Sequence, residues 1–282
     1  MSRIVHVNGS FVPEEEARVS PFDRGYLFAD GVYEVTAVID GKLVDYAPHM
    51  ERLDRSLGEL QMDWPCTKDE LREVHEELVR QNGIEEGVVY MQVTRGVAER
   101  EFSFPENTPT TLFAFTQEKA LIDNPKAETG VEIVSVPEIR WQRRDIKSIA
   151  LLAQCLGKQQ AKEAGAYEAW MVEDGMVTEG TSSSAYIVKD GVVITRPLSN
   201  SILPGVTRRT LLALAAERQI RIEERLFSID EAYKADEAFM TSASSFVLPI
   251  VEIDGRKVGA GAPGEITTAL RRLYLESARS AG

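Results

Sequence analysis

The chain has 282 residues, 43% hydrophobic and 27% charged, a balance typical of a soluble globular protein with room for two domains. Its formal net charge of −13 repels nucleic-acid phosphates and anionic membrane surfaces, so we expect no nucleic acid and no membrane among its partners. Two cysteines and three histidines, without metal-ligand spacing, argue against a metal centre and fit a cytoplasmic protein. The first residues carry no signal-peptide pattern, so we expect none.

The first half of the chain alternates short strands with turn signals. Asn-Gly at 8–9 and Asp-Gly at 40–41 each separate two apolar runs, which predicts tight β-hairpins. Thr67 and Glu70 form a capping box, which predicts a helix start. The expected strands are residues 4–7, 11–12, 31–39, 43–46, 88–93 and 112–115, and the expected helices are residues 49–61 and 67–83.

The second half repeats this pattern, with Asp-Gly turns at 174–175, 190–191 and 254–255. The polar segment 123–130, which contains Pro125, is the expected linker. The sequence therefore predicts two α+β domains, residues 1–122 and residues 131–282. In the second domain we expect a strand at 131–136 and helices at 148–164, at 205–218 and from 265 onward.

Lys147 and Glu179 are the candidate catalytic pair. Lys147 lies at an expected strand-to-helix junction ahead of an apolar run, where partial burial would make its amine a better nucleophile. Glu179 follows a glycine-containing turn. A lysine that forms an imine and a carboxylate that holds a pyridinium are the two groups that a pyridoxal-phosphate enzyme needs most. Taken singly, a solvated lysine and an ordinary turn carboxylate are the simpler interpretations.

Two further features could bind an anion. The expected helix start at 205–208, after Pro204, offers backbone N–H groups and the positive end of a helix dipole. Arg52 could add a cation from its own helix. From spacing alone, a simple helix cap explains the first feature at least equally well. A solvated surface charge is the better explanation of the second.

Seven short motifs stand in order along the chain: DRGY (23–26), DGVYEV (30–35), HMERL (49–53), VTRG (93–96), DIKS (145–148), TEG (178–180) and LPGVTR (203–208). Together they resemble the fold-type IV pyridoxal-phosphate aminotransferases, and within these the D-amino-acid group most closely. The resemblance covers nearly the whole length. It implies an α+β fold with a small N-terminal α/β domain and a larger C-terminal pseudo-barrel domain.

The resemblance also implies a pyridoxal 5′-phosphate cofactor and a role for each matching residue. Lys147 matches the Schiff-base lysine of the family, and Glu179 matches the partner of the ring nitrogen. Arg52 matches a phosphate-binding arginine. The other implied cofactor contacts are Arg140 near the phenolic oxygen, Leu203 against the ring, and Val206, Thr207 and Ser242 around the phosphate.

Substrate binding is where the chain departs from the family pattern. The D-amino-acid enzymes hold the substrate carboxylate with a tyrosine, and with an arginine and a histidine, two residues apart, from the neighbouring subunit. Tyr33 matches the tyrosine and Arg100 the arginine, whereas Phe102 stands at the histidine position. We expect carboxylate binding to be weaker by about 1–3 kcal/mol, since one donor is missing. The shared arginine also implies a homodimer.

The implied reaction is a ping-pong transamination from an amino donor such as D-alanine to a 2-oxo acid, with Lys147 moving the α proton. Three alternatives use the same scaffold: a branched-chain L-amino-acid transaminase, an (R)-amine transaminase and an aminodeoxychorismate lyase-like enzyme. An alternative of another class is a non-catalytic pyridoxal-phosphate-binding protein. The presence of both Lys147 and Glu179 argues against that last one.

Overall fold

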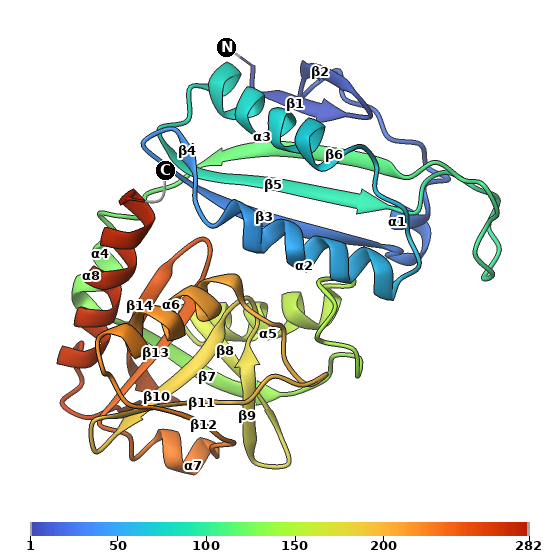
Figure 1. The fold of residues 1–282 in the computed structure, drawn as a ribbon. Coiled ribbons are helices and arrows are strands. Elements are labelled where there is room, and N and C mark those ends of the chain that lie inside the picture. Colours follow the sequence, from blue (N-terminus) through green and yellow to red (C-terminus); the bar gives the residue numbers. More distant parts are fainter. Residues whose placement is uncertain (1, 281–282) are drawn as a thin grey trace. The chain divides into compact units, whose positions relative to one another are not determined.

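The computed structural model describes residues 2–280, which form two compact units. Unit 1 consists of the chain up to Ala120 together with Ile146–Ala150, and unit 2 of Leu121–Asp145 and Leu151–Ser280. The expected linker, residues 123–130, is no open connection. It contains helix α4 (Pro125–Thr129), which Asn124 caps and whose Ala127 packs on the core of unit 2. Both units combine helices with sheets, so the fold class is α+β (Figure 1).

Unit 1 is built on an antiparallel sheet with helices on one face (Figure 1). Within residues 2–120 this sheet has six strands in the order β2-β1-β6-β5-β3-β4. Its strands are β1 (Ile4–Val7), β2 (Ser10–Pro13), β3 (Gly31–Ile39), β4 (Lys42–Leu43), β5 (Glu86–Thr94) and β6 (Thr111–Glu118). Its helices are α1 (Arg24–Phe28), α2 (Tyr46–Glu59) and α3 (Lys68–Asn82).

Alternation along β3, β5 and β6 divides the side chains between two faces of this sheet. One face packs on α2 and α3 and forms the core, with Val32, Val89, Met91, Val93 and Ala114 facing Leu53, Leu57, Leu71 and Leu78. The opposite face carries an aromatic row, in which Tyr33 stacks on Tyr90 and Tyr90 contacts Phe115 in a tilted arrangement. Tyr33 therefore points away from the helices, near the start of β3.

Unit 2 is built on a larger mixed sheet that curls on itself (Figure 1). In its described residues the strands run in the order β12-β11-β10-β13-β14-β7-β8-β9, and β15 pairs with β14. The strands are β7 (Val131–Pro137), β8 (Glu168–Glu173), β9 (Met176–Gly180), β10 (Ser184–Lys189), β11 (Val192–Thr195), β12 (Ile222–Glu224), β13 (Glu237–Ser242), β14 (Phe246–Ile253) and β15 (Arg256–Lys257). The helices besides α4 are α5 (Leu152–Glu163), α6 (Val206–Glu217), α7 (Ile229–Ala232) and α8 (Glu265–Ser280).

The predicted hairpins are confirmed, and their turns show why. At each one an Asn or Asp with positive φ precedes a glycine with positive φ, the backbone that a two-residue hairpin turn requires. The capping box is confirmed as well, with Glu70 N–H bound to Thr67 Oγ1 at 3.2 Å and Gly83 in the left-handed region after α3. These features are local, so the sequence pattern predicts them well.

Two predicted helix starts are wrong. The helix expected at 49–61 begins at Tyr46, within the expected strand 43–46, of which only Leu43 belongs to β4.

The helix expected at 148–164 begins only at Leu152, because Ser148 forms a single antiparallel bridge with Val32 and the neighbouring backbone bonds to the start of β3. Tyr33 N–H donates to the Lys147 carbonyl at 3.0 Å, and Ile149 N–H donates to the Gly31 carbonyl at 3.0 Å. This pairing also places Ile146–Ala150 in unit 1, although the chain before and after it belongs to unit 2.

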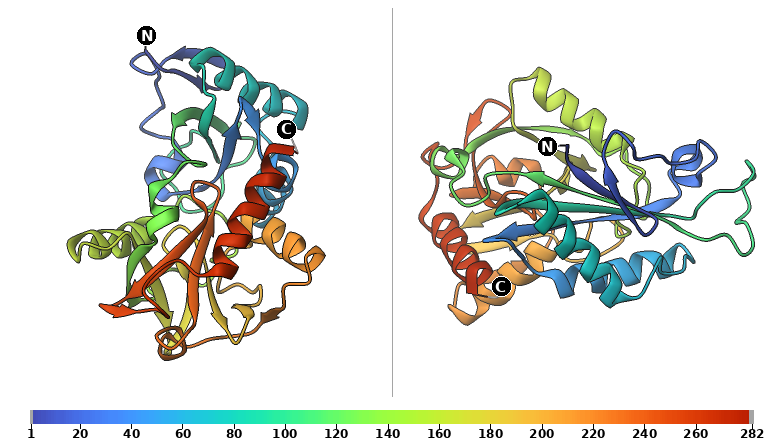
Figure 2. Two further views of the ribbon diagram at one scale, coloured as in Figure 1. Left: turned by 90° about the vertical axis from the view of Figure 1, so that its left-hand side faces the viewer. Right: turned by 90° about the horizontal axis from the view of Figure 1, so that it is seen from above.

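The loop between β5 and β6 extends away from the sheet of unit 1, as Figure 1 and the right-hand view of Figure 2 show. It contains Arg100 and Phe102. Across residues 2–280, none of the helices is long and apolar enough to cross a bilayer.

Candidate active site

Lys147 is held by its backbone against β3. Besides the bond from Tyr33 N–H, its own N–H lies 3.4 Å from Ser56 Oγ on α2. The side chain then carries Nζ over the Tyr33 ring, 4.1 Å from the ring centroid. Among the described residues of unit 1, no carboxylate forms an ion pair with Lys147 Nζ. The ammonium is therefore not fixed by an opposite charge in this unit. Lys147 and Tyr33, predicted separately, therefore meet on the face of the sheet opposite the helices.

Arg52 is not a solvated surface charge. It is buried on α2, where its Nε and Nη2 bind the two carboxylate oxygens of Glu34 at 2.8 and 2.7 Å. His49, one turn earlier, adds a ring-nitrogen contact to Glu34 at 2.7 Å. Burial acts to raise the pKa of Glu34, but Arg52 and His49 outweigh it and hold that pKa well below its ordinary value. The two-point contact fixes the plane of the Arg52 guanidinium.

Glu179 ends β9 in a buried position, and Arg140 is its cationic partner. Arg140 Nη1 binds Glu179 Oε1 at 2.6 Å, and the Leu203 N–H donates to the same carboxylate at 3.1 and 3.2 Å. The other side of the Arg140 guanidinium binds Glu138 through Nη2 at 2.6 Å and Nε at 2.9 Å. Burial raises the pKa of Glu179 above its ordinary value, although Arg140 opposes the shift.

Three predicted site residues of unit 2 thus come together: Arg140, Glu179 and Leu203. Arg140 contacts two carboxylates with one positive charge. Glu138 also has Arg144 Nε at 3.7 Å, and its pKa is lowered. Among the described residues, Glu179 has only a share of Arg140 as the cation bonded to it. The nearby Glu138 charge itself contributes to the raised pKa of Glu179. The arrangement leaves Glu179 suited to a second cationic or N–H partner.

The start of α6 is the candidate anion site of unit 2. Gly205 occupies the N-cap without a side-chain bond to the helix, and the buried residues Val206 and Thr207 form the first turn. The first N–H groups of a helix have no partner inside the helix. A side chain at position 205 would meet Ser184 Oγ at 2.8 Å, so glycine keeps this turn compact. The structure therefore supplies a helix N-terminus where the sequence predicted one.

Ser242 lies at the end of β13, in a turn rich in hydroxyl groups. Its Oγ is 2.8 Å from Ser245 Oγ and 3.4 Å from Ser244 Oγ. Such a turn offers rotatable donors that suit phosphate oxygens. Ser242 and the α6 start both belong to unit 2, together with Glu179.

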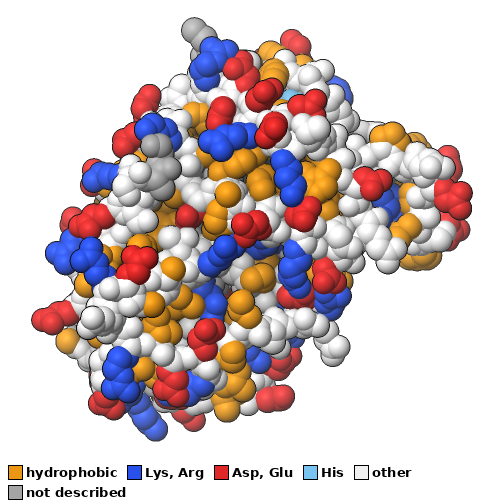
Figure 3. All heavy atoms as spheres, in the orientation of Figure 1, with side chains coloured by type: hydrophobic (Ala, Val, Ile, Leu, Met, Phe, Trp, Pro, Cys, Tyr) orange, Lys and Arg blue, Asp and Glu red, His pale blue; other side chains and the backbone are white. Residues whose placement is uncertain are grey.

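Arg100 and Phe102 lie on the projecting loop of unit 1, which forms the knob at the right of Figure 3. Both are exposed, Phe102 to 76%. The Arg100 guanidinium lies 5.4 Å from the Phe28 ring centroid and 5.6 Å from that of Phe102. Phe28 and Phe102 are themselves in contact, with centroids 5.6 Å apart. Arg100 and Phe102 are therefore both exposed, and both lie next to the ring of Phe28.

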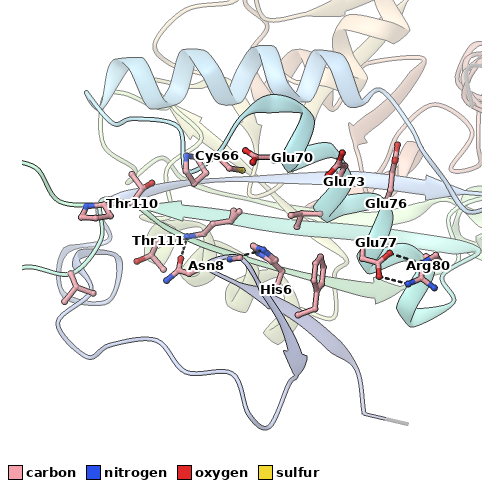
Figure 4. A pocket seen from close by; sticks show the side chains of 17 residues that line it. His6, Asn8, Cys66, Glu70, Glu73, Glu76, Glu77, Arg80, Thr110 and Thr111 are labelled. Carbon is pink, nitrogen blue, oxygen red and sulfur yellow. Dashed lines mark hydrogen bonds and ion pairs between the residues drawn. The ribbon is translucent and has the colours of Figure 1, made fainter.

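A groove of unit 1, with a volume of about 1110 Å³, is not suited to an anionic cofactor (Figure 4). Four glutamates of α3 line it, and its one arginine, Arg80, is bound to Glu77 at 2.5 and 2.8 Å. A phosphate in this groove would meet repulsion from the carboxylates. The lining residues that Figure 4 labels are His6, Asn8, Cys66, Glu70, Glu73, Glu76, Glu77, Arg80, Thr110 and Thr111.

Sequence reasoning missed the carboxylates that orient the predicted arginines. Glu34 orients Arg52, and Glu138 orients Arg140. Glu34 lies inside a predicted strand, on the face opposite Tyr33, and a charge on the core face of a strand is a signal of a buried partner. Glu138 carries no such signal, since it follows the end of β7.

Comparisons with known proteins identify the family of the chain. The profile of the amino-transferase class IV family matches residues 31–253. A D-alanine aminotransferase from Staphylococcus aureus (strain MSSA476) is 43% identical over 278 residues, covering 97% of this chain and 98% of that protein. A D-alanine aminotransferase from Bacillus licheniformis is 40% identical over 274 residues, covering 95% and 96%.

Among solved structures, a branched-chain amino acid aminotransferase from Thermoproteus uzoniensis with norvaline is similar, with a TM-score of 0.86 and 28% identity. The match covers 98% of this chain and 94% of that chain. The family profile spans most of the chain, and relatives above 40% identity span nearly all of it. The chain therefore belongs to the class IV aminotransferases.

Proposed function

We propose that this protein transfers the amino group of a D-amino acid, with D-alanine as the reference donor, to a 2-oxo acid. The observation that carries the proposal is the 40–43% identity to D-alanine aminotransferases over almost the whole chain. The likeness to a branched-chain enzyme is one of fold, at 28% identity, and one fold hosts many activities. The relatives that are similar in sequence therefore support a D-amino acid as the donor, and the branched-chain alternative is not favoured.

Class IV aminotransferases are pyridoxal-phosphate enzymes, and the residues present here fit that cofactor. A phosphate monoester needs N–H and O–H donors, which the start of α6 and the Ser242 turn offer. A protonated pyridine nitrogen needs a buried carboxylate, which Glu179 offers. An aldehyde needs a primary amine, which Lys147 offers. Arg52, fixed by Glu34, would add a cation for the phosphate.

Bound pyridoxal phosphate supplies an electron sink that stabilises negative charge at the α carbon of the substrate. Lys147 would hold the cofactor and, once its amine is released, take the α proton and return a proton on the same face. Its backbone bonds to β3 restrict where Nζ can reach. The Tyr33 ring beneath Nζ shields one side of the amine from water.

Glu179 would keep the ring nitrogen protonated by a charge-assisted hydrogen bond. Its raised pKa supports this role, because a buried carboxylate that shares its counterion gains from a second cation. Arg140, held by Glu138, would contribute a cation to the phenolic oxygen of the cofactor. Leu203 would contribute its N–H to Glu179 and its side chain to the ring face.

The substrate carboxylate would bind to Tyr33 and to Arg100, with Phe102 in place of a third polar donor. An arginine can form a two-point contact with a carboxylate. The apolar Phe102 ring would favour donors with larger apolar side chains.

We further propose a homodimer in which Arg100 serves the partner's site. Unit 1 exposes large apolar side chains before α1, on α1 and on the β5–β6 loop: Phe22 to 54%, Tyr26 to 79% and Phe102 to 76%. Unit 2 exposes Leu152 to 75% on α5. Exposed apolar surface of this extent is typical of protein–protein contact.

The visible spectrum of the purified, reconstituted protein tests the donor. We expect a yellow bound cofactor whose band bleaches on addition of D-alanine and persists with L-alanine or L-leucine. Lys147→Ala is the matched control: it should give no turnover and no bleaching on the timescale of the wild type. Bleaching by L-leucine alone would favour a branched-chain enzyme. Turnover without any 2-oxo acid would favour a lyase.

A mixing experiment tests the shared site. Lys147→Ala and Arg100→Ala homodimers should each be nearly inactive with D-alanine. After subunit exchange, a mixed dimer would contain one site with an intact lysine and an intact arginine, so activity should return. An arginine that acts within its own subunit would give no recovery, and that result would contradict the shared site.

A further inference from the structure

The loop that carries Arg100 and Phe102 is anchored by Arg24, a residue outside the predicted site. Arg24 is 3% exposed and belongs to α1. Its Nη1 donates to the carbonyl of Glu101 at 2.5 Å and to the carbonyl of Ser103 at 3.3 Å. These two carbonyls flank Phe102, so one guanidinium holds the backbone on both sides of that residue.

Arg24 is itself held by Asp30, which lies between two arginines. Asp30 Oδ2 accepts from Arg24 Nε and from Arg95 Nε, each at 2.7 Å, and Oδ1 accepts from Arg95 Nη2 at 3.0 Å. Burial acts to raise the pKa of Asp30, but the two arginines hold it below its ordinary value. Arg95 also donates to the carbonyls of Leu60 and Gln61 at 2.7 and 3.1 Å.

The network reaches the loop at a second point through an aromatic ring. The Phe104 ring lies over the Arg95 guanidinium, with 3.5 Å between Cζ and the ring centroid. Backbone bonds also tie α1 to the start of the loop, since Arg24 N–H donates to the Gly96 carbonyl at 2.9 Å. The loop is therefore attached at residues 96, 101, 103 and 104, and position 100 is exposed between these attachments.

We propose that Arg24 is the positioning residue of the substrate-carboxylate loop, oriented by Asp30 and Arg95. The inference rests on the proposed function, in which Arg100 binds the substrate carboxylate. An exposed arginine on an unanchored loop would lose side-chain and backbone freedom each time it bound a substrate. Anchoring by Arg24 removes part of that loss in advance, so its effect belongs in KM for carboxylate substrates.

The test compares Arg24→Gln with the wild-type holoenzyme. Hydrogen exchange of the amides of residues 99–104 should become faster, with the exchange of β3 and β5 unchanged. KM for D-alanine and for the 2-oxo acid should each rise about 10-fold, the loss of one charge-assisted hydrogen bond. The value of kcat should stay within about 3-fold, and the visible spectrum of the bound cofactor should stay unchanged.

Arg24→Lys is the second variant, because its ammonium keeps the ion pair with Asp30 and protects the fold. It can reach one carbonyl rather than both, so we expect a KM between those of the wild type and Arg24→Gln. Arg18→Gln is the matched control. Arg18 also donates to two carbonyls, those of Glu15 and Ala17 at 2.6 and 2.8 Å, but on an exposed segment. It should leave both KM values unchanged.

Unchanged exchange at residues 99–104 in both Arg24 variants would overturn the anchoring role. Faster exchange with unchanged KM would overturn the positioning role and would count against Arg100 as the carboxylate ligand, while leaving the transaminase activity itself intact. Loss of the bleaching reaction in the wild type would instead remove the proposed function.

Discussion

Two buried glutamate–arginine pairs, one in each unit, have opposite electrostatic balances. In unit 1, Glu34 receives two hydrogen bonds from Arg52 and one contact from His49, and its pKa is lowered. In unit 2, Glu179 shares Arg140 with Glu138, and its pKa is raised. Both carboxylates are buried, so burial alone does not distinguish them.

Glu34 and Glu179 differ in how much positive charge the neighbouring side chains provide to each carboxylate. A fully matched pair such as Glu34 and Arg52 is a structural support, because removal of either partner leaves a buried charge unpaired. An undermatched carboxylate such as Glu179 has capacity for a cation that the chain does not itself provide. The comparison therefore separates Glu34, a carboxylate that orients an arginine, from Glu179, a carboxylate that can bind a ligand.

The largest effect should come from breaking the matched pair. Glu34→Gln leaves Arg52 buried without a counter-charge, and we expect the free energy of unfolding to fall by about 3 kcal/mol. Denaturant unfolding of the cofactor-free protein at pH 7 measures it. A change below about 0.5 kcal/mol would mean that Glu34 and Arg52 are not a matched structural pair.

The undermatched carboxylate should respond in activity rather than in stability. Glu179→Gln should lower kcat about 100-fold, since a neutral amide holds a ring proton poorly, a loss of about 2.7 kcal/mol. The unfolding free energy of the cofactor-free protein should change by less than about 1 kcal/mol, because Arg140 keeps Glu138 as its partner. A large loss of stability with normal kcat would reverse the comparison.

A pH series sharpens the comparison in unit 1, where His75 is a second buried titrating group. Burial lowers the pKa of His75 to about 4 from an ordinary value of 6.5. The unfolded chain therefore binds this proton more readily, so the stability contributed by neutral His75 is present above pH 6.5 and is lost as pH falls towards 4.

We expect this loss to reach about 2 kcal/mol at about pH 5, and His75→Phe should remove that part of the slope. In the His75→Phe background, the remaining pH dependence includes Glu34 together with the other groups whose pKa is lowered, among them His49 and Asp30. The lowered pKa of Glu34 predicts stability that is present above pH 4.5 and lost only below it. An identical slope between about pH 6.5 and about pH 5 in the wild type and in His75→Phe would contradict the assignment to His75.

The smallest effect should come from relieving the competition in unit 2. Glu138→Gln leaves Arg140 to Glu179 alone and removes the nearby negative charge that raises the pKa of Glu179. We expect Glu179 to become better matched and kcat to fall about 10-fold, because the carboxylate then favours Arg140 over the cofactor. Glu132→Gln on the exposed face of β7 is the control. An increase in kcat would show that sharing Arg140 hinders the reaction.

The predictions from sequence that hold best are those with short-range causes. The Asn-Gly and Asp-Gly turns and the capping box of α3 need only residues a few positions apart. The motif order along the chain was also enough to indicate the family, which the relatives above 40% identity confirm. The proposed roles of Lys147 and Glu179 stay predictions, which the spectral test and the Glu179→Gln variant address.

The sequence alone determined the local turns, most of the helix starts, the α+β class and the family, since these depend on nearest neighbours and on ordered motifs. Only the tertiary structure decided the partners of the charged residues. The pairing of residues 146–150 with β3, the choice of Glu34 for Arg52 and the hold of Arg24 on Glu101 and Ser103 all join distant positions. A buried charge must find its partner wherever the fold brings one, and spacing in the sequence does not record that distance.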